Sequence, residues 1–221
     1  MSQKSFVEFL VAARDSTPTR IRYDRRDLTQ LLFHAGNEGF DFTAEDVSSV
    51  AGALEANVIV VLDAERFDGT SGLWRQMWGA RHLEYLVEHV VRRHTDAELW
   101  SVLNDEAADT PAAGPPPDPP PDNRILDFLR LVAARADVLD SLKPRDMQAF
   151  LAAAADFGFP FSEADFDAYI WNLEVALAAR RGERFDAHFP LWQTMWGRYY
   201  LEYLVTDLLP GVEETGLEHG R

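Results

Sequence analysis

The sequence contains no cysteine, only two lysines and no long apolar run. Without cysteine the chain can form no disulfide and offers no thiolate as a nucleophile or zinc ligand. No stretch approaches the about 18 consecutive apolar residues of a membrane-spanning helix, and the opening MSQKSFVEFL lacks the apolar core of a signal peptide. We therefore expect a soluble, cytoplasmic protein.

Positive charge is also scarce. Lys and Arg total 21 against 37 Asp and Glu, which gives a net charge of −16, and the deficit is spread along the chain. A protein that binds nucleic acid neutralises phosphates with basic side chains, so nucleic acid is excluded as a partner on electrostatic grounds. The acidic surface favours basic partners. Hydrophobic residues make up 47% of the chain, enough for folded cores.

A tryptophan-rich stretch occurs twice. Residues 65–87 and 183–205, which contain LWRQMWGARHLEYLV and LWQTMWGRYYLEYLV, are identical at 14 of 23 positions at an offset of 118. Upstream, EGFDFTAED (38–46) matches FGFPFSEAD (157–165) at an offset of 119, so the second copy lacks one residue between these points. Similarity at nearly constant spacing identifies an internal duplication.

The copies flank an acidic, proline-rich stretch, NDEAADTPAAGPPPDPPPDN, at 104–123. Consecutive prolines lack amide donors and favour extended polyproline II, so this stretch is interpreted as a spacer; a proline-rich ligand for a recognition module is the alternative. The predicted organisation is one helical repeat over 1–103, the linker, a second repeat over 124–210 and a flexible tail over 211–221.

Apolar residues recur at helical spacing along each copy, and no strand is predicted. SFVEFLVAAR and RILDFLRLVAARADVLDSL have this spacing, as do DLTQLLFHAGNEG and DMQAFLAAAADFG, each of which ends at a glycine suited to a left-handed C′ position. Thr43 and Ser162 are expected to cap the third helices, with Asp46 and Asp165 completing capping boxes.

The third helices are predicted to reach about Leu62 and Arg180. NVIVVL in the first of them could form a strand, but its counterpart has helical spacing and duplicated segments should fold alike. A last helix is expected over Leu73–Arg93 and again over Leu191–Leu209. The predicted fold is therefore all-α, with two homologous units of about four helices packed as a pseudo-two-fold pair.

The first half of each copy resembles the Nif11 domain family. The features that carry the resemblance are SQKSFVEFL, a short second helix, and GFDFTAEDV or GFPFSEADF leading into the third helix, over roughly 1–55 and 124–175. Members of that family occur in nitrogen-fixing bacteria and as leader regions of ribosomally made, modified peptides, where modifying enzymes recognise them. The resemblance implies a helical recognition module with no activity of its own.

This chain departs from the leader-peptide pattern. No Gly-Gly or Ala-Gly cleavage site precedes a short core rich in Cys, Ser or Thr, and each copy adds a Trp-rich segment. The expected function is therefore non-enzymatic: a recognition or adaptor protein that binds a peptide or protein partner, as an accessory in a modified-peptide pathway. An enzyme is the less favoured interpretation.

The Trp-rich helix is the first candidate binding surface. Trp74, Trp78 and Tyr85 are spaced to form one stripe, and Trp192, Trp196 and Tyr203 repeat it. Gly79 and Gly197 would lie mid-helix, where glycine costs about 1 kcal/mol relative to alanine, so a close backbone approach is expected at each. The favoured interpretation makes these helices the core and the seam between the repeats. An aromatic-lined groove for a peptide helix or an apolar ligand is the alternative.

Charged residues retained in both copies are the second set of candidates. Glu84 and Glu202 interrupt LEYLV identically; ion pairing to Arg81 and Arg198 explains them, and ligand contact is the alternative. ERFD also recurs, where Arg66 and Arg184 could bind a carboxylate of a partner.

A rival hypothesis is a small enzyme or ligand carrier with a pocket lined by the four tryptophans and Glu84 or Glu202. The sequence holds no phosphate-binding glycine loop, nucleophile elbow or paired-carboxylate signature, so no catalytic residue is assigned. His82 and His89 are seven residues apart, but Tyr200 and Asp207 replace them in the second copy. We therefore expect neither a metal ion nor another cofactor. The expected partners are a peptide or protein and a further copy of the chain, without nucleic acid or membrane.

Overall fold

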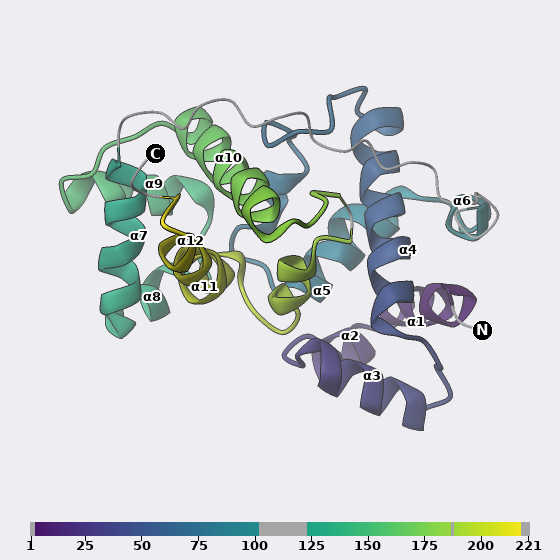
Figure 1. The fold of residues 1–221 in the computed structure, drawn as a ribbon. Coiled ribbons are helices and arrows are strands. Elements are labelled where there is room, and N and C mark those ends of the chain that lie inside the picture. The colour runs from purple at the N-terminus through teal and green to yellow at the C-terminus, as the bar shows by residue number, and fades with distance from the viewer. Residues whose placement is uncertain (1–2, 102–122, 187, 218–221) are drawn as a thin grey trace. The chain divides into compact units, whose positions relative to one another are not determined.

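The computed structural model describes residues 3–101, 123–186 and 188–217. Within these ranges the regular elements are helices and no strand forms (Figure 1), so the predicted all-α class is confirmed. The predicted linker, 104–123, lies outside the described residues apart from Asn123.

The helices comprise α-helices and shorter 3₁₀ and π segments. In the first half of the chain they are α1 (Gln3–Asp15), α2 (Thr17–Tyr23), α3 (Leu28–Asn37), α4 (Ala44–Ala56), η1 (Asn57–Leu62), η2 (Trp74–Met77), α5 (His82–Tyr85), η3 (Leu86–Val90), η4 (Val91–Arg93) and α6 (Asp96–Ser101). In the second half they are α7 (Arg124–Ala134), α8 (Ala136–Leu142), α9 (Met147–Asp156), α10 (Glu163–Arg181), η5 (Pro190–Met195), α11 (Tyr200–Tyr203), η6 (Leu204–Leu208) and α12 (Leu209–Thr215).

The chain divides into two compact units, and each takes a segment from both halves of the sequence. Unit 1 contains the described residues of Met1–Phe67, Arg81–Ala112 and Asp186–Arg198; unit 2 contains those of Asp68–Ala80, Ala113–Phe185 and Tyr199–Arg221. The units therefore do not coincide with the repeats expected over 1–103 and 124–210. The pseudo-two-fold packing of the repeats stays a prediction.

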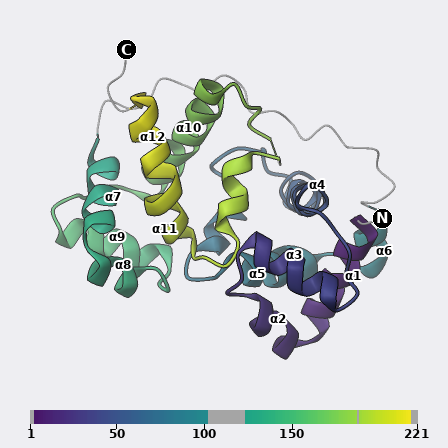
Figure 2. The same ribbon diagram turned by 60° about the horizontal axis from the view of Figure 1, so that its bottom comes forward.

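In unit 1, α1 packs against α2 and α4 (Figure 2). The apolar spacing of α1 places Phe6, Phe9 and Leu10 on one face, and all three are fully buried. Phe9 meets the ring of Tyr23 edge-on, with centroids 5.0 Å apart. This aromatic core fixes α2 and the segment that follows it.

In unit 2, α7 packs against α8, η6 and α12, and α12 also contacts α10. Phe150 lies between Phe128 and Phe166, with ring centroids 5.3 and 5.2 Å away. Each unit thus has an aromatic core, which joins α1 and α2 in unit 1 and α7, α9 and α10 in unit 2.

Both predicted capping boxes are confirmed. The Asp46 amide donates to Thr43 Oγ1 at 3.2 Å and the Thr43 amide donates to the Asp46 carboxylate at 2.8 Å. Ser162 and Asp165 make the same pair of bonds, at 3.1 and 3.2 Å. These bonds satisfy amides that the first turn of a helix leaves without partners.

The glycines after α3 and α9 adopt the predicted left-handed backbone, with φ of 93° at Gly39 and 87° at Gly158. A residue with a side chain is strained in this region, so glycine is favoured where these helices stop.

Two helical details differ from the sequence prediction. RILDFLRLVAARADVLDSL is divided at Arg135, whose φ of −126° and ψ of 88° interrupt the helix between α7 and α8. In the first half, the segment that corresponds to α8 forms helix α2, which was not predicted. Ser16 caps α2 by accepting a hydrogen bond from the Thr19 amide at 3.3 Å. The sequence signal was present, since Ser-Thr-Pro places a capping residue before a proline that tolerates the first helical turn.

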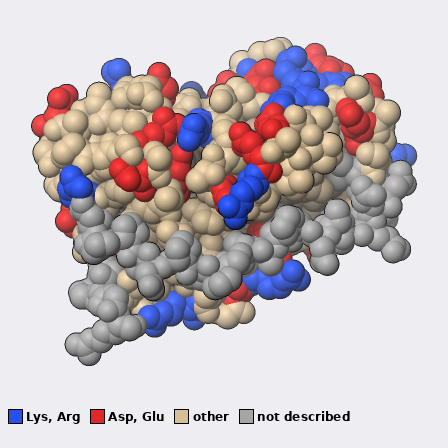
Figure 3. All heavy atoms as spheres, turned by 90° about the horizontal axis from the view of Figure 1, so that it is seen from above, with Lys and Arg blue, Asp and Glu red and all other residues tan. Residues whose placement is uncertain are grey.

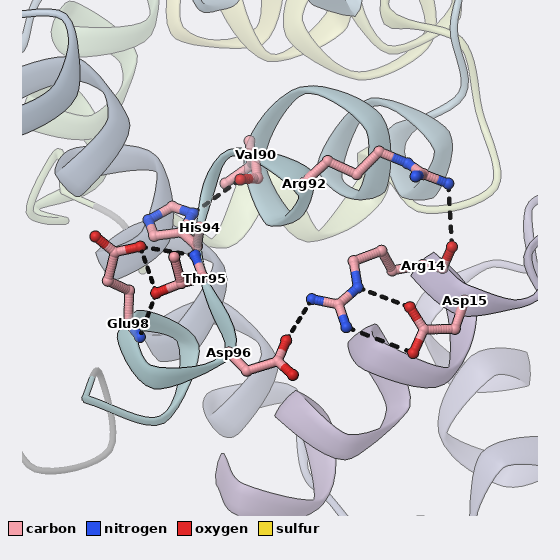
Figure 4. A network of polar contacts seen from close by, with 8 residues as sticks. All are labelled: Arg14, Asp15, Val90, Arg92, His94, Thr95, Asp96 and Glu98. Atoms are coloured by element: carbon pink, nitrogen blue, oxygen red, sulfur yellow. Dashed lines mark hydrogen bonds and ion pairs between the residues drawn. The ribbon is translucent and has the colours of Figure 1, made fainter.

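Helix α6 was also missed. Its N-terminus is closed by Thr95 and Glu98, which exchange backbone-to-side-chain hydrogen bonds, and Arg14 of α1 holds it by an ion pair to Asp96 at 2.8 Å (Figure 4). At the other end of the chain, residues 211–215 of the stretch expected as a flexible tail belong to α12, and Val212 is fully buried.

The two long helices differ by a π turn. After Ala56, α4 continues into η1, a π-helix, so the helical path reaches Leu62 as predicted, whereas α10 is α-helical from Glu163 to Arg181. A π turn contains one residue more than an α turn because its hydrogen bonds join i to i+5. The π turn therefore lies in the region where the sequence repeat changes from an offset of 119 to 118.

Candidate functional site

The Trp-rich stretch is not one helix, so the prediction of a continuous helix over Leu73–Arg93 is wrong. Helix η2 ends at Met77, Trp78 is extended with φ of −68° and ψ of 127°, and Gly79 follows with φ of 78°. Helical hydrogen bonding stops there and begins again at α5. Trp74, Trp78 and Tyr85 consequently do not form one helical stripe.

The second copy departs from its prediction in the same way. Trp196 is extended with φ of −57° and ψ of 129°, and Gly197 has φ of 80°. Helical structure resumes at Tyr200 and runs through η6 and α12 to Thr215, beyond the predicted end at Leu209. A glycine in the left-handed region turns the chain between the two helical segments. A residue with a Cβ atom would be strained in this backbone conformation.

The close backbone approach expected at these glycines is confirmed, although no helices cross there. A Cβ atom on Gly79 would lie 3.2 Å from the carbonyl oxygen of Pro144. On Gly197 it would lie 2.7 Å from the carbonyl carbon of Arg26 and 2.9 Å from the amide nitrogen of Asp27. Each turn is thus pressed against the backbone just before α9 or α3.

The tryptophan after each 3₁₀ helix belongs to a core. Trp78 is 9% exposed, and its ring centroid lies 4.6 Å from that of Phe150 and 5.6 Å from that of Tyr200. Trp196 is 4% exposed and meets His82 edge-on at 4.8 Å. The favoured interpretation of these two side chains as core residues is confirmed.

Trp74 and Trp192 are half-buried. The indole of Trp74 donates to the carbonyl oxygen of Asp68 at 2.9 Å, and Trp192 meets the ring of Phe189 at 6.0 Å. These contacts hold the loop that precedes each 3₁₀ helix.

The structure does not bring the predicted binding residues together within one unit. Unit 1 contains Arg66, Glu84, Tyr85, Trp192 and Trp196, and unit 2 contains Trp74, Trp78, Arg184, Glu202 and Tyr203. Arg66 and Arg184 are exposed on the loops that follow η1 and α10. The pocket lined by all four tryptophans stays a prediction.

Glu84 and Glu202 are ion-paired, with partners that helical spacing did not predict. Glu84 lies 3.7 Å from Arg20 of α2, and its side chain is 40% exposed. Glu202 accepts a hydrogen bond from Lys143 at 2.8 Å and another from the Tyr199 amide at 2.9 Å. Both glutamates therefore connect the start of α5 or α11 to a helix of the first part of their own unit.

A pair of buried glutamates was not selected from the sequence. Tyr85 donates its hydroxyl to Glu55 at 2.7 Å, and Tyr203 donates to Glu174 at 2.5 Å. Both tyrosines are fully buried, and the glutamates are 7% and 4% exposed. Their recurrence as Leu-Glu at an offset of 119, with LEYLV following at 118, was the available signal.

Burial is the largest cause of the pKa shifts in and around these pairs. Desolvation raises the pKa of Glu55 to about 7, despite the hydrogen bond from Tyr85, which favours the charged form. Desolvation likewise raises the pKa of Tyr203 well above its usual value, and it lowers the pKa of His82 to about 4. His82, which stacks at an angle on Tyr85 with centroids 5.9 Å apart, is therefore neutral at pH 7.

Such an environment could tune an acid for catalysis, but Glu55 is nearly inaccessible and its described partner is another buried side chain. The pair lies within the core of unit 1, where the hydrogen bond pairs a buried carboxyl group of α4 with a buried hydroxyl of α5.

Within the described ranges, no group of three or more His, Asp or Glu side chains is arranged to hold a metal ion. The same residues include no helix of the length and apolarity that crossing a membrane requires. On the face drawn in Figure 3, acidic and basic side chains of the described residues are interspersed with uncharged ones rather than gathered by sign.

The chain matches no protein-family model, and no curated protein or solved structure is significantly similar to it. The resemblance to the Nif11 domain family therefore stays a prediction.

Proposed function

We propose that this protein is a non-enzymatic recognition or adaptor protein that binds a peptide or protein partner through unit 1. One observation carries the proposal: the large apolar side chains exposed in unit 1 have polar or small counterparts in unit 2. Among the described residues, the exposed large apolar side chains of unit 1 are those of Ile21, Phe33, Val60, Val61 and Leu62. Val60, Val61 and Leu62 are consecutive, so they expose a continuous apolar stretch, and contiguous exposed apolar surface marks interaction sites.

The contrast is clearest at the ends of the long helices. Val60, Val61 and Leu62 of η1 are 46%, 65% and 39% exposed, whereas α10 ends in Ala179, Arg180 and Arg181. On α3, Phe33 is 66% exposed, and the position 119 residues later is Ala152. The apolar residues are therefore not a general requirement of this helical unit, which favours a binding role specific to unit 1.

This proposal includes an internal duplication in which the copies have diverged. Its support is the repetition of local features in both halves: the capping boxes, the left-handed Gly79 and Gly197, and the buried Tyr–Glu pairs. Unit 1 would then have gained the exposed apolar side chains that bind the partner.

The chain favours a partner segment that is both apolar and basic. Its apolar side chains would pack on the exposed residues of η1, and its basic residues would complement the chain's net charge of −16. The resemblance of residues 1–55 and 124–175 to the Nif11 domain extends this to a pathway. We propose that the partner is a precursor peptide or a modifying enzyme of a modified-peptide system.

The proposal is tested with Val61→Arg, which places a charge on the most exposed residue of η1. The tagged chain and its variant are used to capture partners from the native host, and candidate precursor peptides are titrated against each. Because a charge at an apolar interface must be desolvated without a counter-ion, we expect the variant to lose about tenfold or more in affinity. Its midpoint of urea unfolding should stay unchanged, since the side chain makes little contact in the folded chain.

Phe157→Arg is the matched control because it places the same charge on a large apolar residue of unit 2 that is 42% exposed. A partner captured equally by the wild type and the control, and depleted with Val61→Arg, supports the proposal. Equal capture by all three proteins would contradict the role of unit 1.

A further inference from the structure

Each compact unit is completed by a tryptophan segment from the other half of the sequence. Segment A, residues 68–80, belongs to unit 2, and segment B, residues 186–198, belongs to unit 1. The two segments have equal length and lie at the 118-residue offset of the repeat. They share Asp, Leu, Trp, Met, Trp and Gly at the same six of thirteen positions. Equivalent segments are therefore exchanged between the halves.

Segment B is an integral part of the core of unit 1. Trp196 meets the ring of Phe6 at 6.3 Å, and Gly197 lies against the backbone of Arg26 and Asp27. The ring of His188 forms a hydrogen bond with Ser49 of α4 at 3.0 Å. Removing segment B would leave the buried faces of α1 and α5 open to water.

Segment A occupies the corresponding place in unit 2. Trp78 packs on Phe150 of α9 and Phe166 of α10, and Gly79 lies against Pro144 and Arg145. The glycine contacts correspond, since Arg26 and Arg145 are 119 residues apart, so at this contact the repeat alone would allow either segment to occupy either place.

A charged contact distinguishes the two segments. Arg75 of segment A lies 2.7 Å from Glu163 and 3.3 Å from Asp167, both on α10. At the corresponding positions of the first half, α4 has Ala44 and Ser48, and segment B has Gln193 in place of Arg75. The two carboxylates therefore lie where segment A, which carries the arginine, docks. The first half has no carboxylate at the two corresponding positions.

A steric contact also favours segment A over segment B in unit 2. Gly69 of segment A lies under Trp171 so closely that a Cβ atom would be 2.3 Å from the Trp171 Cβ. Segment B has Ala187 at this position, so it cannot occupy the place of segment A unless Trp171 shifts. In the first half, the residue that corresponds to Trp171 is Gly52.

We propose that this exchange is encoded by the sequence: each half of the chain carries a docking face that accepts the tryptophan segment of the other half and disfavours its own. The halves are then a complementing pair, and each is the specific protein partner of the other. The association requires the segments and does not require the covalent connection through 104–123.

The first test uses the full chain with a protease site inserted between residues 104 and 122. After complete cleavage, the two halves should elute together in size-exclusion chromatography under native conditions and separate in denaturant, because each retains a buried segment of the other. Separation of the halves under native conditions would overturn the proposal.

The second test identifies which segment docks on which half. The native chain has no cysteine, so only introduced cysteines react with a maleimide. In the cleavable chain, Arg75→Cys is combined with Glu163→Cys and treated with a short bis-maleimide. We expect the two halves to become covalently joined on a denaturing gel. The matched control combines Arg75→Cys with Ala44→Cys, which would react with each other only if segment A docked on its own half.

The two cysteine pairs together distinguish an encoded exchange from an interface between unexchanged repeats. Joined halves with the first pair, and no link within the first half with the second, support an encoded exchange. Co-eluting halves that fail to join through residues 75 and 163, or a link between residues 75 and 44, would show an ordinary interface between unexchanged repeats.

Discussion

Gly197→Ala is expected to lower the free energy of unfolding by about 3 kcal/mol or more, because two costs combine at this position. The backbone at Gly197 has φ of 80°, a region in which a Cβ atom is strained. The added atom would also lie 2.7–2.9 Å from backbone atoms of Arg26 and Asp27. A flexible side chain could rotate away from such a contact, but the backbone between α2 and α3 cannot. The midpoint of urea unfolding, followed by tryptophan fluorescence, measures the effect.

Two further glycines separate these costs. Gly158→Ala carries the conformational cost alone, since φ is 87° and nothing lies within 4 Å of the added atom; about 1 kcal/mol is expected. Gly79→Ala should fall between the two, because its nearest neighbours are backbone atoms at 3.2–3.3 Å. If Gly197→Ala were no more damaging than Gly158→Ala, the close approach would contribute nothing to stability.

Local features of the fold were accessible from the sequence because they depend on a few adjacent residues. Thr43 and Asp46 predict their own capping box, and a glycine at the end of an apolar helix pattern predicts the left-handed turn at Gly39. In these cases the groups that interact are close in the chain, so their spacing determines whether they can meet.

The course of the Trp-rich stretch was not accessible in this way. The spacing of Trp74, Trp78 and Tyr85 fits a helical stripe, yet burial of Trp78 among Phe150, Phe166 and Tyr200 requires the chain to leave the helix first. Tertiary packing therefore overrides helical periodicity here. Glycine marked the position correctly, but a close approach and a break in the helix have the same sequence signal.

The candidate site was predicted less well than the fold, for a related reason. A repeat in the sequence shows which surfaces correspond, but not which copy of a segment occupies which copy of a face. Only the differences between the copies, such as Trp171 against Gly52 and Arg75 against Gln193, carry that information. Likewise, Glu55 and Tyr85 are 30 residues apart, so spacing could not indicate that the glutamate is buried against a tyrosine hydroxyl.

Glu55→Gln is expected to remove a pH dependence of stability of about 3 kcal/mol. Burial raises the pKa of Glu55 from 4.5 to about 7 in the folded chain. Between these values the folded chain holds a proton that the unfolded chain has released, so the free energy of unfolding falls as pH rises through this window. Glutamine does not titrate and keeps an oxygen that can accept the Tyr85 hydrogen bond. The variant should therefore gain stability relative to the wild type from about pH 4.5 to pH 7.

The difference between the two proteins is the quantity to measure, because His82 acts in the opposite direction. Burial lowers the pKa of His82 from 6.5 to about 4, so the unfolded chain binds more protons over that range and stability rises with pH. The two contributions partly cancel in the wild type, but His82 contributes equally to both proteins and drops out of their difference. Urea unfolding at several pH values gives that difference directly.

One further variant defines how the result is interpreted. Tyr85→Phe removes the hydrogen bond that favours the charged carboxylate, so the total loss of stability with rising pH should become larger and extend above pH 7. If the difference between Glu55→Gln and the wild type stayed flat from pH 4.5 to pH 7, burial would not hold the proton of Glu55 in the folded chain.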